Sequence, residues 1–75
     1  MIHIQGKVVY EDLEMGFWGI VDKQGNKWRP VSMPDQLKVA GAQVQVTASE
    51  VDEDSIFMWG TPIRIMSFHT IPIFD

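Results

Sequence analysis

Apolar and polar residues alternate along residues 2–11 of the chain, and no other feature constrains its fold more. Ile2, Ile4 and Val8 fall on one parity, and polar side chains occupy most of the positions between them. A period of two places successive side chains on opposite faces of an extended strand. The pattern therefore predicts a long first strand with one buried face. Gly6 lies inside it, and a glycine at such a position indicates a bulge or a sharp bend.

Four further strands are expected, separated by turn residues. They are residues 17–22, 27–32, 43–49 and 56–68. The polar turn between the first two of these ranges contains Gly25, which supplies the positive φ of a tight hairpin. Pro30 cannot donate to a ladder, so the strand that contains it is expected to be an edge strand or to be bulged there. Pro62 requires the last strand to bend or restart at residues 60–62.

One short segment, residues 34–38, has helical character. Pro34 at a first helical position and Asp35 in the first turn fit a single helical turn, which Gly41 would end. Three strands, a helical link and two more strands are the order of elements in the OB fold. We therefore predict an all-β chain that forms a single domain over residues 1–75, a five-stranded OB-like barrel with one short helical turn between strands 3 and 4. An SH3-like barrel fits less well, because its helical turn usually precedes the last strand.

The composition of the chain argues against several classes of protein. There is no cysteine, which excludes disulfides and thiolate metal sites. The formal net charge of −4 disfavours general nucleic-acid binding, which needs clustered lysine and arginine. No apolar run approaches the roughly 20 residues that cross a bilayer, and residues 1–5 lack the pattern of a secretory signal. We therefore expect a cytoplasmic protein that has no membrane partner.

Catalysis has little support in the sequence. No serine has an evident histidine and carboxylate partner, and no glycine-rich phosphate loop opens a helix. Gly16 and Gly19 lie at the head of an expected strand, which is the wrong context for binding phosphate. His3 and His69 are neighbours if the first and last strands pair, but two histidines are too few for a transition-metal site. We predict no enzyme activity, no catalytic residue, no metal site and no cofactor.

Three segments carry a resemblance to known domains. They are residues 6–10 (GKVVY), residues 16–21 (GFWGIV) and residues 58–65 (MWGTPIRI), together with Trp28 and Pro30. In these segments the chain resembles a family of small uncharacterised bacterial OB-fold-like domains. The likeness covers nearly the whole chain and implies the fold, but it implies no activity.

A weaker resemblance is to cold-shock domains, in which Gly-x-Val is followed by Lys-Gly-Phe-Gly-Phe-Ile. Residues 6–8 and 16–20 match this pattern in part. Met15 replaces the lysine, and residues 27–31 (KWRPV) stand where those domains carry an aromatic third strand. The resemblance implies stacking of bases on surface aromatics, and these departures remove most of the positions that stacking needs.

Aromatic and basic side chains are the candidates for a binding site, although large aromatics in a small barrel more often fill the core. Trp28 is the best candidate for an exposed aromatic, because Lys27 and Arg29 flank it. Trp18 and Trp59 each have an apolar neighbour of the opposite parity, so the sequence leaves open which of them points outward. The candidate ligand-binding residues are Trp28, Arg29, Arg64, Trp18 and Trp59.

Acidic residues are expected at the rim of the face that binds ligands in OB folds. Six of the ten acidic residues lie in the two loops that flank this face: Glu11, Asp12, Glu14, Asp52, Glu53 and Asp54. A polyanion is repelled there over about 8 Å at physiological salt. This charge disfavours nucleic acid as the partner, and the alternative is that the two loops are simply solvated.

The main functional hypothesis is a non-catalytic binding or interaction module of unknown ligand. In it, a peptide, a protein or a small ligand meets the barrel face near Trp28, Arg29 and Arg64. One alternative is weak single-stranded nucleic-acid binding through a cold-shock-like face. Another is a structural subunit of a homo-oligomer, such as a homodimer, in which residues 71–74 pack on a second copy.

Overall fold

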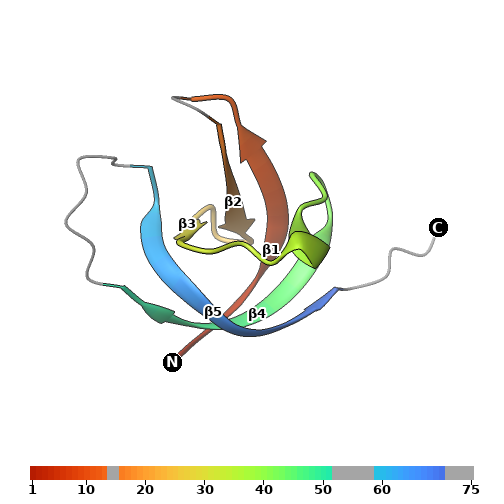
Figure 1. The fold of residues 1–75 in the computed structure, drawn as a ribbon. Coiled ribbons are helices and arrows are strands. Elements are labelled where there is room, and N and C mark those ends of the chain that lie inside the picture. Colours follow the sequence, from red (N-terminus) through yellow and green to blue (C-terminus); the bar gives the residue numbers. More distant parts are fainter. Residues whose placement is uncertain (14–15, 52–58, 71–75) are drawn as a thin grey trace.

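Five strands and one short helical turn make up the part of the chain that the computed structural model describes, residues 1–13, 16–51 and 59–70 (Figure 1). The strands are β1 (Ile2–Glu11), β2 (Phe17–Asp22), β3 (Lys27–Pro30), β4 (Gln43–Glu50) and β5 (Thr61–Thr70). The turn η1 (Asp35–Leu37) is a 3-10 helix between β3 and β4. The predicted all-β architecture, with its helical turn between strands 3 and 4, is confirmed.

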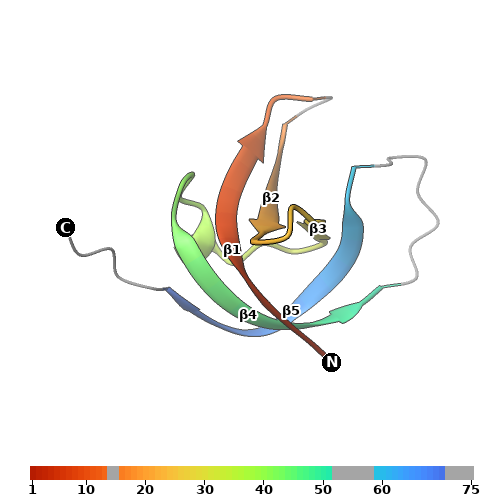
Figure 2. The same cartoon turned by 180° about the vertical axis from the view of Figure 1, so that it is seen from behind.

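The strands close into a barrel in the order β1-β2-β3-β5-β4. β3 and β5 run parallel, and the other neighbouring strands are antiparallel. Figures 1 and 2 show the β1–β2 hairpin rising away from the region where β4 and β5 cross. β1 takes part in both halves of the barrel, because its first half pairs with β4 and its second half pairs with β2. Closure gives each strand two neighbours and removes the open edges of a flat sheet.

Gly6 lies where the two pairings of β1 overlap. It is aligned with Asp22 of β2 on one side and with Val44 of β4 on the other. A Cβ atom at this position would overlap the carbonyl oxygen of Val21, so the close approach of the β2 backbone accounts for the glycine. The register is continuous through Gly6, so of the two expected features, a bulge or a sharp bend, the bulge is absent at this residue. The register shift of the described strands lies between β4 and β5, where Met66 of β5 is the extra residue between the pairs Thr47–Ser67 and Ala48–Ile65.

Eight buried apolar side chains form the core of the described barrel. They are Ile4, Val8, Ile20, Leu37, Val44, Val46, Ala48 and Ile63. No polar or charged side chain of the described residues is fully buried. Leu37 brings η1 into the core, which explains why a single helical turn is retained between β3 and β4. Burying a side chain of this size contributes about 1.5–3 kcal/mol.

Pro30 ends β3, two residues before the end expected from the sequence. The strand is neither bulged nor at an edge, because β2 and β5 flank it. Ile20 is aligned with Trp28, so the pair two positions further along the ladder would set Pro30 opposite Trp18. Pro30 has no N–H to donate there, and the β2–β3 register stops. On its other side Pro30 is aligned with Ile63 of β5.

The last strand starts where the prediction placed a restart. β5 begins at Thr61, directly after Gly60, whose φ is +71°. Pro62 is accommodated as its second residue. The strand continues to Thr70, beyond the expected end at residue 68. The expected residues 56–58 lie outside the described part of the chain.

The β2–β3 turn is organised by one carboxylate. Asp22 Oδ1 accepts hydrogen bonds from the backbone N–H groups of Gln24 (3.0 Å) and Asn26 (2.8 Å). Its Oδ2 accepts from Asn26 Nδ2 and from the indole Nε1 of Trp28, both at 3.1 Å. Desolvation raises the pKa of the Asp22 carboxyl, but the hydrogen bonds from Trp28, Asn26 and Gln24 together outweigh it. The pKa of Asp22 therefore lies below its ordinary value.

The lowered pKa makes a prediction for Asp22→Asn. The ionised carboxylate stabilises the fold above the pKa of the unfolded chain, about 3.9, and this stabilisation is lost as the pH falls through the folded-state pKa. In urea unfolding at pH 7 the variant is expected to have a lower midpoint than the parent chain, and the difference is expected to shrink as the pH falls below about 3.9, the pKa of the unfolded chain. Asp35→Asn is the control, because the Asp35 side chain is 92% exposed. A midpoint difference that stays constant from pH 7 to pH 2 would contradict the assignment.

Candidate functional site

The two faces of β2 carry different aromatic residues. Trp18 and Ile20 share the inward parity, and Trp18 packs half-buried against the core. The ring of Trp18 also meets Tyr10 of β1 edge to face, with the ring centroids 5.0 Å apart. Phe17 and Gly19 have the opposite parity and face outward. Only the outer face is therefore free to contribute a surface on this strand.

Trp28 points into the barrel. It is aligned with buried Ile20, packs against the core, and donates its indole N–H to Asp22. The expectation that Trp28 is the exposed aromatic is therefore wrong. Its neighbours Lys27 and Arg29 have the opposite parity and lie on the outer face. All three tryptophans are half-buried, so none is fully exposed.

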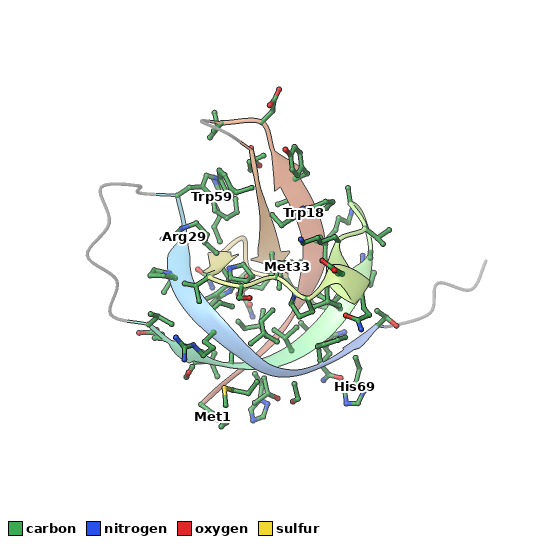
Figure 3. The ribbon with its side chains drawn as sticks, viewed as in Figure 1. Met1, Trp18, Arg29, Met33, Trp59 and His69 are labelled. Atoms are coloured by element: carbon green, nitrogen blue, oxygen red, sulfur yellow. The ribbon has the colours of Figure 1, made fainter. Side chains whose placement is uncertain are left out.

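Trp59 lies on the outside of the barrel, over Gly19. A Cβ atom at Gly19 would lie 2.5 Å from Cζ3 of the Trp59 ring. Gly19 faces outward and is nevertheless buried, because this ring covers it. Phe17 meets the same ring at 5.1 Å between centroids and an interplanar angle of 67°. Figure 3 shows Trp59 and Arg29 on the same side of the barrel, apart from Trp18.

Lys27 completes this aromatic group. Its ammonium nitrogen lies 5.5 Å from the centroid of the Trp59 ring, a distance at which the electron-rich face of an indole attracts a cation. The chain bends at Gly60, where a Cβ atom would lie 3.1 Å from the Lys27 carbonyl oxygen. This close approach brings the residue before β5 back against β3. The position of Trp59 is thus set by the backbone next to it.

Two more cationic side chains share the face. Lys7 of β1 is aligned with Val21, and Val21 is aligned with Lys27, so the two lysines flank β2. Arg29 follows Lys27 by two residues on the same face of β3. We call the group formed by these residues the outer patch. It consists of Lys7, Phe17, Lys27, Arg29 and Trp59.

Three of the five candidate residues lie on the outer side of the barrel. Arg29 and Trp59 belong to the outer patch. Arg64 is exposed beside it, because Arg29 is aligned with Pro62 and Arg64 follows two residues later on the same face of β5. Trp18 and Trp28 face the core and are not brought to this surface.

Phe17, Lys27 and Lys7 were not among the candidates. The signal that would have found the first two is the register of the β2–β3 hairpin. Asp22 faces Asn26 across a turn of residues 23–25, which sets Lys27 opposite Val21, and Phe17 has the parity of Val21. Lys7 depends on the register between β1 and β2, for which the sequence offers no comparable marker.

Other expected features are separated or fall outside the described residues. β4 lies between His3 and His69, because β1 and β5 each pair with β4, so the proposed neighbourhood of the two histidines is wrong. His3 Nδ1 instead lies 3.2 Å from the hydroxyl of Thr47. Of the acidic rim, Glu11 and Asp12 are described. Glu14, Asp52, Glu53 and Asp54 and the tail at residues 71–74 lie outside the described part.

The described residues contain no group of three histidine, cysteine or acidic residues that could hold a metal ion. They also contain no helix long and apolar enough to cross a membrane.

The contact of Trp59 with Gly19 can be tested by a double-mutant cycle. Gly19→Ala is expected to displace the Trp59 ring and to destabilise the fold by about 1–3 kcal/mol, as overpacking does. In a Trp59→Ala background the same change is expected to cost much less, because the ring is gone. Urea unfolding of the four proteins measures the coupling. Equal effects of Gly19→Ala in both backgrounds would show that the ring does not cover Gly19.

The indole N–H resonances provide an independent readout of the same contact. In Gly19→Ala the Trp59 resonance is expected to shift, while that of Trp28 stays in place because Asp22 holds its N–H. A shift confined to Trp28 would contradict the assignment of the inner and outer rings.

Comparisons of the chain with protein-family models, curated proteins and solved structures gave no match. The resemblance to OB-fold-like domains therefore rests on the residues quoted for it. We therefore infer the function of the chain from its own geometry, and above all from the outer patch.

Proposed function

We propose that the chain is a non-catalytic binding module and that its ligand contacts the outer patch. The observation that carries this proposal is the position of two aromatic rings. Phe17 and Trp59 pack on each other outside the core, whereas Trp18 and Trp28 pack against it. A large aromatic side chain that the core does not use, with cations beside it, is a typical centre of a binding surface.

The barrel itself argues for surface binding. Its described interior is filled by the side chains of eight apolar residues, and a barrel of this size has no room for a ligand inside. The strand order β1-β2-β3-β5-β4 supports an OB-like fold, and OB folds bind their ligands on the face of strands 2 and 3. Phe17 and Lys27 occupy that face in this chain. The module therefore meets its ligand where the fold most often does so.

The proposal differs from the sequence-based hypothesis in its central residue. Trp59 replaces Trp28, because Trp28 faces inward. Arg29 and Arg64 remain at the patch and at its border. The patch contains two lysines and an arginine, and these cations favour a ligand that bears negative charge.

The proposal is tested by nuclear magnetic resonance of the 15N-labelled chain. Three probes are titrated: a ten-residue acidic peptide, its lysine-bearing counterpart, and a ten-nucleotide oligo-dT. At least one probe is expected to bind with saturation and to shift the Trp59 indole and the amides of Phe17, Gly19 and Lys27. The Trp28 indole, held by Asp22, is expected to move little.

Two variants sharpen this experiment. Trp59→Ala is expected to lower the affinity for the bound probe about tenfold, which corresponds to losing roughly 1.4 kcal/mol at a contact residue. Met66→Ala is the matched control, because Met66 is a 55% exposed apolar residue that belongs to β5 and not to the patch. Saturable shifts that avoid the patch, or no saturable shift with any of the three probes, would contradict the proposal.

A further inference from the structure

We infer that the occupant of the outer patch is an acidic peptide segment in extended conformation, with an aromatic or apolar side chain set beside Trp59. The inference rests on the proposed function and specifies its ligand. Charge, spacing and ring geometry support it separately.

The first argument is the separation of charge over the molecule. The chain has a formal net charge of −4, yet four of its six lysine and arginine residues lie on one outer region of the barrel: Lys7, Lys27, Arg29 and Arg64. Among the outward-facing positions of β1, β2, β3 and β5, all within the described residues, the carboxylate is Glu11 alone. Glu11 follows Lys7 by four residues, about 13 Å along an extended strand. Within the described residues, negative charge on a ligand is therefore complementary to the patch.

The second argument is the spacing of the cations. Lys27 and Arg29 are alternate residues of one strand, so their Cα atoms are about 6.7 Å apart on one face. Carboxylates at alternate positions of an extended peptide repeat at the same distance. A peptide that lies along β3 can therefore set one carboxylate opposite each cation without bending. The residue between the two carboxylates points away from the barrel.

The third argument concerns the aromatic rings. A base that stacks needs an open ring face of about its own area. The ammonium of Lys27 lies over the Trp59 ring, Gly19 lies against the ring, and Phe17 meets it at 67°. Stacking would have to displace Lys27, the same cation that attracts the phosphate. A peptide side chain instead packs at the border of the two rings and leaves Lys27 free to meet a carboxylate.

The test is fluorescence anisotropy with three labelled probes at 50 mM salt. The probes are a ten-residue peptide of alternating Glu and Ser with one central Phe, the same peptide with Lys in place of Glu, and oligo-dT of ten nucleotides. The acidic peptide is expected to bind more tightly than either of the others. Its affinity is expected to fall as salt is raised, because exposed charge pairs are screened.

Charge-removing variants locate the site. Lys7→Gln and Lys27→Gln are each expected to lower the affinity for the acidic peptide about two- to fivefold, the range for an exposed ion pair. Lys38→Gln removes the same charge from η1, where Lys38 pairs with Asp35, and is expected to have no effect. Replacing the central Phe of the acidic peptide by Ser is also expected to lower the affinity. Thermal unfolding of each variant verifies that the barrel is intact.

The other outcomes are informative in different ways. If oligo-dT binds more tightly than the acidic peptide and Lys27→Gln weakens it, the peptide inference is wrong and the proposed binding module stands. If none of the probes binds, both are wrong. If Lys38→Gln lowers the affinity for the acidic peptide as much as Lys27→Gln does, the attraction is non-specific and the patch is not the site.

Discussion

The parallel pairing of β3 with β5 closes the barrel, and the positions of its tryptophans depend on that pairing. Trp28 is aligned with Thr61, so the residue before β5 comes to lie beside Lys27. From there the ring of Trp59 reaches back over Gly19 on the outer face. The same alignment holds Trp28 on the inner face, beside Ile20. The non-local register of β3 with β5 therefore places Trp28 against the core and Trp59 on the surface.

Much of the fold follows from local patterns in the sequence. Alternation predicts β1, the glycine-containing turn predicts the β2–β3 hairpin, and Pro62 predicts the start of β5. These features act over a few residues, so the sequence contains them in full. Pro30 shows the limit, since a residue without an N–H indicates an edge in an open sheet. In the closed barrel it ends one ladder of a strand that keeps both of its neighbours.

The candidate site was only partly predictable, for two physical reasons. The inward direction of Trp28 depends on the hairpin register, and both of its neighbours are basic, so local composition favoured exposure. The position of Trp59 depends on its contact with Gly19, which lies forty positions earlier in the chain. No pattern within β2 or β5 predicts this contact. The relation of the two histidines likewise depends on non-local pairing. They would be neighbours only if the first and last strands paired, and β4 separates those strands.

The covering of Gly19 by Trp59 bears on binding as well as on folding. The contact connects Trp59, two residues before β5, with Gly19 of β2, although β2 and β5 are not neighbouring strands. It lies close to the point where the β2–β3 ladder ends. A ring fixed in this way has already lost most of its rotational freedom before any ligand arrives. Association then costs less side-chain entropy than it would at a free tryptophan. The packing of the Trp59 ring on Gly19 therefore stabilises the fold and also lowers the entropy cost of binding a ligand.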